Sequence, residues 1–478
     1  MRNSILISLI FFLQNCTVYC ENEAERIVRQ RMESTNTPGM VFLIAKDGKV
    51  IDEGYYGKAN VELDADITKS SNFAIASMSK TYTAAAILLM AENGLLDLED
   101  SVKKYIPEAP DSWQTMTIKH LLMHSSGLVE DWELHDWNKS NEMFLKTQTN
   151  EEFLKVHFNQ ELKFKPGTDN RYASGHFVLG IVIERIAGSS YEEYLEEKIL
   201  GPLSLKETFV DHPYKIIPHR VSGYFDYDPA IINGPVSGIG NGILIAPVAY
   251  GRGDAGIRTT AYDLLKFYNA LFTDDFLSDQ SRSLMFEPTR LDNGDKVSYG
   301  AGWMNWPLGG LAVSEHSGVF RTGFSSQALL VPKDKFVVII LTNLRGSATF
   351  TLAKELASLY YPELEKLSKK FAVKDSNMAL TNVHLEIFQT INSKKENVNI
   401  HMNFPFSYYS KPLKESISST ESITFLGERD LQDQKVEFFG VDIQTLRYYR
   451  LNGKKVLYTT VYLDKSDKLV FIDYPETE

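Results

Sequence analysis

The stretch FAIASMSKTYTAAAILLM, residues 73–90, places a serine and a lysine at the start of a long apolar run. Ser77 and Lys80 are three residues apart, so a helix puts their side chains on one face. The run that follows is apolar on all sides, which is typical of a buried helix. Burial disfavours the charged form of a lysine, and a neutral lysine can take the proton of a serine hydroxyl. Ser77 is therefore a candidate nucleophile, close to the free N–H groups of a helix start.

A second match to the same S-x-x-K pattern begins at Ser101 and ends at Lys104. It lies among charged residues, in a segment that we expect to face solvent. Because S-x-x-K is a common pattern, we interpret this second match as a coincidence.

Length, charge and cysteine content exclude several classes of protein. The chain has 478 residues, enough for two domains. Its formal net charge of −12, from 50 basic and 62 acidic residues, disfavours non-specific binding to nucleic acid or anionic lipid. The two cysteines are Cys16 and Cys20. We therefore expect no internal disulfide, no thiol catalysis and no cysteine-based zinc site.

The amino-terminal segment has the pattern of a secretory signal peptide. A positive start, Met1-Arg2-Asn3, is followed by an apolar run over residues 5–13 that is short for a membrane span. We predict a signal peptide over residues 1–20 and a secreted or periplasmic/extracellular location. A lipoprotein site at Cys16 and an uncleaved anchor are the alternatives. No later stretch is long and apolar enough to cross a bilayer.

Apolar periodicity predicts strands at both ends of the first 360 residues and helices between them. An Asp-Gly turn joins two predicted strands, residues 40–45 and 50–55. The other expected strands are residues 299–304, 312–316, 325–332 and 336–341, and the clearest helices are residues 21–32, 175–187, 260–271 and 348–360. This order predicts an α+β fold whose antiparallel sheet is built from both ends of the domain and flanked by helices.

The carboxy-terminal quarter is expected to be separate. We predict a large first domain over residues 21–362 and a charged linker over residues 363–378. Alternating residues then predict a small antiparallel β domain over residues 379–478, with strands at 397–402 and 456–463 and a hairpin turn at Asn452-Gly453. Its role as a lid, a partner-binding module or a dimer surface is open.

The sequence disfavours two other kinds of catalytic site. No serine has a glycine two residues away on both sides, which disfavours an α/β-hydrolase nucleophile. His120 and His124 are four residues apart, as in some zinc sites, but Leu121 stands where a glutamate is expected. We therefore expect these histidines to form the polar edge of a short helix capped by Thr117.

Two further segments favour a catalytic role for Ser77. Tyr172 precedes a buried helix, and a phenol near a lysine ammonium can have a lowered pKa and transfer protons. The segment His316-Ser317-Gly318 ends a strand with small polar residues, so a substrate can lie against backbone donors there.

Together these segments resemble the three motifs of serine β-lactamases and penicillin-binding proteins. Ser77 to Lys80, Tyr172 to Ser174 and His316 to Gly318 occur in the order and approximate spacing of that family. The nearest likeness is to its class C β-lactamase-like branch, which includes esterases and D-amino-acid peptidases. Supporting segments at residues 120–128, 164–167 and 253–260 extend the resemblance over roughly residues 23–360. It implies the β-lactamase/transpeptidase-like fold.

The resemblance also implies roles for residues. Ser77 would form an acyl-enzyme while Lys80 and Tyr172 share the proton transfers. The backbone N–H groups of Ser77 and Val319 would form the oxyanion hole. No metal and no organic cofactor would be needed. The residues that would bind a small-molecule or peptide substrate are Ser174, His316, Ser317 and Gly318.

Two departures from the family pattern bear on the substrate. The second motif commonly ends in Asn and here ends in Ser174; the third commonly begins with Lys and here begins with His316. A histidine is mostly neutral at pH 7 and only partly replaces a fixed charge for a substrate carboxylate. We therefore expect an ester or small amide substrate. The alternatives are a D-amino-acid peptidase, DD-carboxypeptidase or β-lactamase, and a catalytically weak binding or scaffold protein; the oligomeric state is open.

Overall fold

The computed structural model describes residues 22–130, 149–212, 214–227, 238–242, 253–308, 311–320, 322–364, 374–391, 399–400, 411–431, 436–438, 441–454, 456–472 and 476–477. The leader expected over residues 1–20, with both cysteines, lies outside these ranges, so the signal peptide stays a prediction. Within these ranges, no helix combines the length and the apolar character that a membrane span requires.

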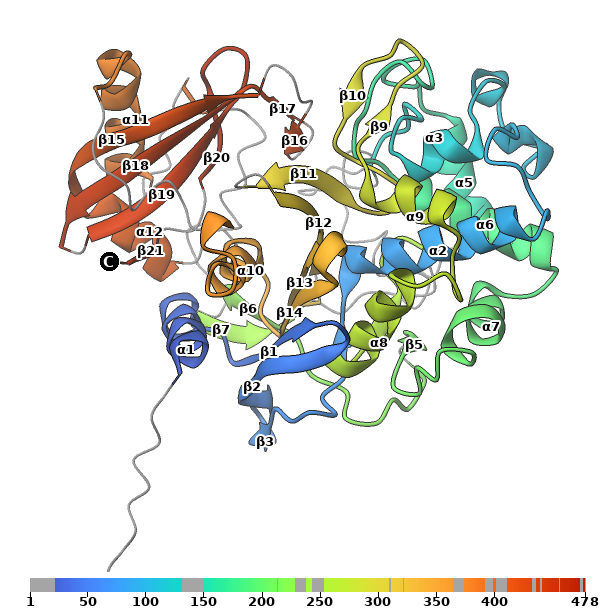
Figure 1. Ribbon diagram of the computed structural model, residues 1–478, viewed down its shortest axis with the longest axis horizontal. Helices are drawn as coiled ribbons and strands as arrows, with labels where there is room; N and C mark the ends of the chain where they lie inside the picture. Colours follow the sequence, from blue (N-terminus) through green and yellow to red (C-terminus); the bar gives the residue numbers. More distant parts are fainter. Residues whose placement is uncertain are drawn as a thin grey trace, which may run out of the picture.

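A seven-stranded antiparallel sheet forms the centre of the main domain (Figure 1). Its strand order is β11-β12-β13-β14-β1-β2-β3. The strands are β1 (Gly39–Lys46), β2 (Lys49–Asn60), β3 (Ala65–Asp66), β11 (Met304–Leu308), β12 (Leu311–Phe320), β13 (Phe324–Val331) and β14 (Phe336–Thr342). β1 pairs with β14, so strands from both ends of the domain meet in the middle of the sheet. The predicted α+β sheet is confirmed.

Helices cover both faces of this sheet, which explains why its central strands are apolar throughout. Along β1, Val41 and Leu43 pack into the core that contains α2 (Ser79–Glu92), α6 (Gly175–Ala187) and α8 (Ala261–Leu271). The alternate residues Met40 and Phe42 pack with α1 (Glu23–Thr35) and α10 (Thr349–Ser358). Successive side chains of a strand point to opposite faces, so β1 is buried on both.

Local capping signals fix several helices where they were expected. Thr260 accepts a hydrogen bond from the Asp263 N–H and starts α8. Gly188 has a left-handed φ of 65° and ends α6. Among the described residues, the domain also contains the helices α3 (Ile118–Leu122), α5 (Asn150–Phe158), α7 (Tyr191–Leu195) and α9 (Asp279–Phe286). A small separate sheet contains β4 (Phe73–Ala74), β8 (Ile257–Thr259) and β5 (Phe209–Val210).

One predicted strand is misplaced. The segment expected as a strand over residues 299–304 is a turn, and β11 begins only at Met304. Gly302 has a φ of 78°, which reverses the chain and ends extended structure there. A β bridge between Tyr299 and Met304 closes the turn. β12 is longer than expected and carries the whole His316 segment.

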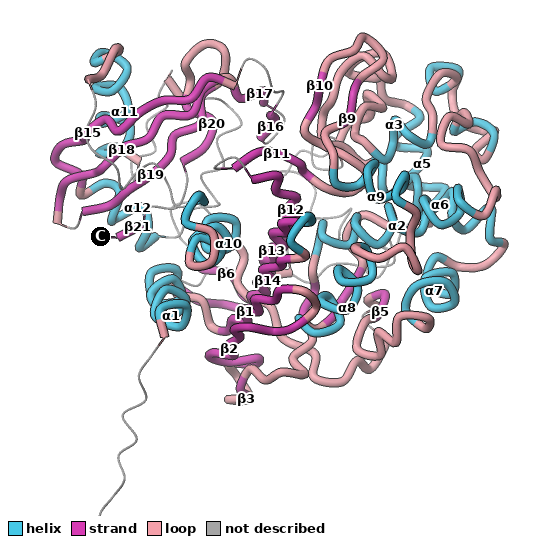
Figure 2. The backbone as a smooth tube through the Cα atoms, in the orientation of Figure 1, coloured by secondary structure: helices cyan, strands magenta, loops and turns pink. Residues whose placement is uncertain are grey.

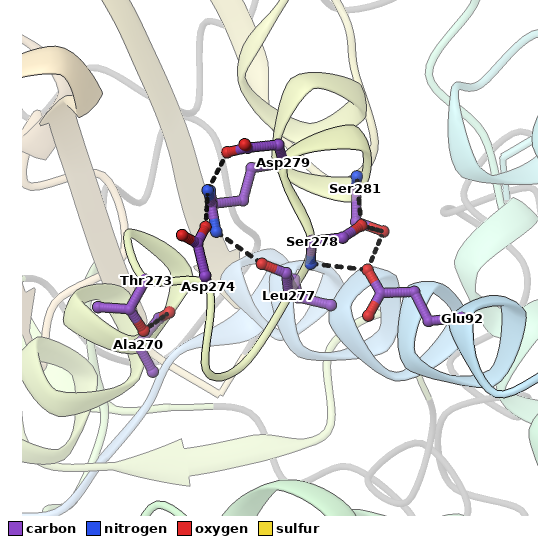
Figure 3. A network of polar contacts seen from close by, with 9 residues as sticks. Glu92, Ala270, Thr273, Asp274, Leu277, Ser278, Asp279 and Ser281 are labelled. Atoms are coloured by element: carbon purple, nitrogen blue, oxygen red, sulfur yellow. Dashed lines mark hydrogen bonds and ion pairs between the residues drawn. The ribbon is translucent and has the colours of Figure 1, made fainter.

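The far end of α2 is tied to α9 by a polar network (Figure 3). Glu92 Oε1 accepts hydrogen bonds from the Ser278 N–H at 2.8 Å and from the Ser281 hydroxyl at 2.6 Å. Arg282 pairs with Asp274 in the same network. The helix that carries the candidate lysine is therefore anchored at its carboxy-terminal end.

The carboxy-terminal part contains the expected antiparallel sheet (Figure 2). Its strands are β15 (Thr420–Asp430), β18 (Thr445–Gly453), β19 (Val456–Leu463), β20 (Leu469–Ile472) and β21 (Glu476–Thr477), and β16 (Val436–Phe438) pairs with β17 (Val441–Ile443). Gly453 ends β18, so the hairpin turn follows the predicted Asn452-Gly453 pair. Most of the strand predicted over residues 397–402 lies outside the described residues.

Two helices in this part were not predicted. α11 (Met378–Thr390) and α12 (Lys411–Ser418) occupy a region that was expected to be wholly β. In α11 the residues His384, Ile387 and Phe388 are buried at helical spacing, against Tyr449 of the sheet. Arg447 of β18 forms a buried ion pair with Asp375, just before α11, at 2.6 Å. The same apolar cluster continues to α1 and α10.

Candidate active site

Ser77 and Lys80 meet at the start of α2. Ser77 lies in a short 3-10 helix, Ala76–Met78, which leads directly into α2. Lys80 Nζ lies 3.2 Å from Ser77 Oγ and also donates to the Asp254 carbonyl at 3.0 Å. Lys80 is 2% exposed, whereas Ser77 is only partly buried. A buried amine thus contacts a hydroxyl that solvent can reach.

The chain makes an unusual turn immediately before the nucleophile. Ala76 has a φ of 49°, a left-handed conformation that alanine rarely adopts. The turn is held from outside, because the Ile75 N–H donates to the Ile257 carbonyl at 3.0 Å. The Ser79 hydroxyl accepts a bond from the Ile257 N–H at 3.0 Å. Strained backbone held in this way is frequent at active sites, and no sequence pattern had indicated it here.

Tyr172 lies over the same pair of residues. Lys80 Nζ is 4.9 Å from the centre of the Tyr172 ring, and the Ser77 side chain lies beside the phenol and acts on its pKa. Burial raises the pKa of Tyr172 well above its ordinary value, and the charge of the Glu130 carboxylate adds to this effect. The pKa of Tyr172 is therefore not lowered by the nearby lysine as expected, because the effect of burial is larger. Tyr172 is therefore a neutral phenol at pH 7.

β12 also borders the site. Its main chain lies against residues 75 and 76, the turn that precedes Ser77 and is called the nucleophile turn below. The Ser326 hydroxyl of β13 donates to the Ile75 carbonyl at 2.8 Å. A Cβ atom added to Gly318 would lie 2.1 Å from the Ile75 carbonyl oxygen and 3.1 Å from Ala76 Cβ. Only glycine allows this approach. It places the main chain of Gly318 and Val319 beside Ser77, where the oxyanion hole was predicted.

His316 is directed into the protein. Its Nδ1 donates to the Ser317 carbonyl at 2.7 Å, and its Nε2 accepts from the Tyr299 hydroxyl at 3.0 Å. In the neutral ring the proton therefore lies on Nδ1, and Nε2 is left as the acceptor. Burial, followed by the Lys80 charge, lowers the pKa of His316 to about 3. Both ring nitrogens are engaged, so the ring does not offer a cation to a substrate, and the substrate-binding role of His316 stays a prediction.

Ser174 has a partner that the sequence did not indicate. Its hydroxyl donates to Glu130 Oε2 at 3.1 Å, and both residues are buried. Glu130 also acts on the Tyr172 and Tyr299 phenols through its charge. Sequence reasoning missed Glu130, because it follows the predicted helix near His120 without any motif of its own. A carboxylate in this position places a negative charge near Tyr172.

The two rejected sequence matches have local structural roles. Ser101 caps a 3-10 turn, where it accepts a bond from the Lys103 N–H at 3.3 Å. His120 Nδ1 accepts from the Thr117 N–H at 3.2 Å within the predicted helix cap. His124 instead contacts the Tyr172 segment. The described residues contain no group of three potential metal ligands.

A serine, a lysine and a tyrosine converge on one hydroxyl at the edge of an antiparallel sheet. This arrangement defines a serine hydrolase of the β-lactamase/transpeptidase-like fold. The Beta-lactamase family model matches residues 24–360. The chain belongs to the Beta-lactamase family.

Known relatives agree with this fold. The chain is 30% identical over 315 residues to Penicillin-binding protein 4* of Bacillus subtilis (strain 168), covering 63% of this chain and 67% of that one. The chain spans about two thirds of the length of the curated relatives it matches. The octameric penicillin-binding protein homologue from Pyrococcus abyssi superposes with a TM-score of 0.61 at 21% identity, over 95% of this chain and 99% of that one. D-amino acid amidase from Ochrobactrum anthropi SV3 gives 0.60 at 21% identity, over 71% and 98%.

Proposed function

We propose that this protein hydrolyses an ester or a small amide through a covalent acyl-enzyme on Ser77. The observation that carries the proposal is the contact of the Ser77 hydroxyl with both Lys80 Nζ, at 3.2 Å, and the Tyr172 phenol. A base within hydrogen-bond reach is what a serine needs to become a nucleophile.

The reaction has two halves. Lys80, in its neutral form, takes the Ser77 proton while Oγ bonds to the acyl carbon. The backbone N–H groups of Ser77 and Val319 stabilise the oxyanion. Collapse of this intermediate breaks the bond to the leaving group, which receives the proton through the Lys80–Tyr172 pair. Water then attacks the acyl carbon and gives up a proton through the same pair to Ser77 Oγ, so that the bond between Oγ and the acyl carbon breaks and the acid is released.

The chemistry around His316 supports a substrate without an acyl-side carboxylate. His316 is neutral and its nitrogens are engaged, so it supplies no positive charge. Two acidic residues, Glu130 and Asp254, act on Tyr172 through their charges. A negative substrate would meet these carboxylates and be repelled. We expect esters and neutral amides to be hydrolysed faster than β-lactams or peptides that end in a carboxylate.

A second candidate substrate is the amide of an amino acid with a free amine. Glu130, which accepts from Ser174 beside Tyr172, favours it, because a carboxylate there attracts an ammonium group. The solved amidase with which the fold superposes was crystallised with phenylalanine amide.

Turnover of a substrate panel tests these proposals. The panel contains p-nitrophenyl esters, nitrocefin, D-alanyl peptides, and phenylalanine amide in both configurations. We expect esters or amino-acid amides to have the highest kcat/KM. Turnover of nitrocefin far above every ester and amide would contradict the interpretation of His316.

A further inference from the structure

His124 is a buried histidine that the proposed reaction does not use. It follows α3 and has a left-handed φ of 53°. Its side chain is 1% exposed. A left-handed backbone is uncommon for residues other than glycine, with asparagine, aspartate and histidine most tolerant of it. This conformation turns both the carbonyl and the ring of His124 toward the segment that carries Tyr172.

His124 accepts two hydrogen bonds, one from each of the residues that flank Tyr172 in the sequence. The His124 carbonyl accepts from the Arg171 N–H at 2.8 Å. Its Nδ1 accepts from the Ala173 N–H at 3.1 Å. The backbone N–H groups of the two residues that flank Tyr172 are therefore held by one residue. This matters because residues 169–173 form neither a helix nor a strand that would fix them.

The His124 ring also packs on the Tyr172 ring itself. The two ring centres are 4.3 Å apart, with an angle of 33° between the planes. Tyr299 covers the other edge of His124 at 4.4 Å, in a perpendicular arrangement. Tyr172 thus contacts His124 through its backbone neighbours and through its ring.

The hydrogen bonds define the protonation state of His124. Because Nδ1 accepts an N–H, the proton of the neutral ring lies on Nε2. Burial, followed by the nearby Lys80 charge, keeps the pKa of His124 well below its ordinary value. The acceptor at Nδ1 is therefore available throughout the neutral pH range.

We infer that His124 is a positioning residue, which holds the Tyr172 phenol on Ser77 by fixing the peptide groups of residues 171 and 173. The inference rests on the proposed function, because it assigns a role within the same reaction. Displacement of a catalytic group by about 1 Å can cost about 100-fold in rate. Loss of these two hydrogen bonds should consequently lower kcat and leave substrate binding largely intact.

Two substitutions separate the acceptor from the ring. His124→Asn keeps an acceptor close to the Nδ1 position and tolerates the left-handed backbone. His124→Phe keeps a ring that can pack on Tyr172 and removes the acceptor. If His124→Phe does not fold, His124→Ala replaces it, because alanine also lacks the acceptor and adds no bulk. His384→Asn is the matched control, since His384 is a buried histidine whose Nδ1 bonds a tyrosine, Tyr449, in the other sheet.

The measurement is kcat and KM on the best substrate of the panel, normalised to sites titrated with a fluorophosphonate. We expect kcat to fall about 100-fold in His124→Phe and less than about 10-fold in His124→Asn, with KM nearly unchanged in both. His384→Asn should lower thermal stability alone. Equal losses in the Asn and Phe variants, or a kcat for His124→Phe within about threefold of wild type, would overturn the inference. Absence of labelling on Ser77 in the wild type would instead overturn the proposed function.

Discussion

The Tyr299 hydroxyl lies 3.0 Å from Nε2 of His316, and this bond holds the buried His316 ring inside the protein. The other ring nitrogen donates to the Ser317 carbonyl. His316, the first residue of the third motif, therefore supports β12 from inside the protein, and Lys80 is the basic residue that contacts Ser77.

The first prediction concerns stability at acid pH. The pKa of His316 is lowered from 6.5 to about 3 in the folded protein, so the unfolded chain binds more protons between these values. Stability is therefore lost as the pH falls below 6.5, and the His316 contribution reaches about 2 kcal/mol at pH 5. His316→Gln, which keeps an acceptor for Tyr299, should lose about 2 kcal/mol less between pH 7 and pH 5 in urea unfolding. Identical losses in both proteins would contradict it.

The second prediction concerns Gly318. In Gly318→Ala the new Cβ would meet the Ile75 carbonyl oxygen at 2.1 Å, so β12 must move away from the nucleophile turn. We expect kcat/KM to fall about 100-fold, because the oxyanion donors lose their alignment. Gly94→Ala is the control: it has a φ of 68° and open space around it. That variant should lose about 1 kcal/mol of stability and keep its kcat. Similar activity in the two variants would show that the approach of β12 is unimportant.

The third prediction concerns the anchor of α2. Glu92 accepts two hydrogen bonds from the start of α9. Although burial opposes it, these bonds and Arg282 lower the pKa of Glu92, so its stabilisation is present above the ordinary carboxyl pKa and is lost as the pH falls. Glu92→Gln should cost about 1 kcal/mol at pH 7, because the site is partly exposed, and should leave kcat unchanged. A large fall in kcat with unchanged stability would indicate that Glu92 acts on the site.

The fourth prediction concerns Glu130 and amines. If Glu130 receives the ammonium group of an amino-acid amide, Glu130→Gln should raise KM for phenylalanine amide about 10-fold, the value of one charge-assisted hydrogen bond. The N-acetylated amide has no charge and serves as the control substrate, so its KM should not change. An equal effect on both amides would mean that Glu130 supports Tyr172 without contacting the amine.

The sequence predicted the parts of this protein that depend on local signals. The run of apolar residues in α6 and its glycine cap placed that helix correctly, and the cap at Thr260 did the same for α8. The joint order of the three motifs correctly predicted that Ser77, Tyr172 and His316 lie in one region of the fold. Each of these signals lies within a few neighbouring residues.

The features that were missed arise from contacts between distant segments. The left-handed φ of Ala76 is imposed by β8 and β12, which no local pattern reveals. Glu130 and His124 acquire their roles through residues more than 40 positions away. The raised pKa of Tyr172 likewise depends on burial and on Glu130. α11 was missed because its buried residues are mixed with polar ones and a tertiary contact with the sheet stabilises it.

The central claim is that Ser77 is the nucleophile, and covalent labelling tests it most directly. The intact protein is incubated with a fluorophosphonate, and the modified residue is located by mass spectrometry. Ser101→Ala is the matched control, because Ser101 starts the second S-x-x-K match and only caps a turn. We predict one adduct on Ser77 in the wild type and in Ser101→Ala, and no adduct in Ser77→Ala. Equal labelling of Ser77→Ala, or an adduct on another serine, would contradict the account.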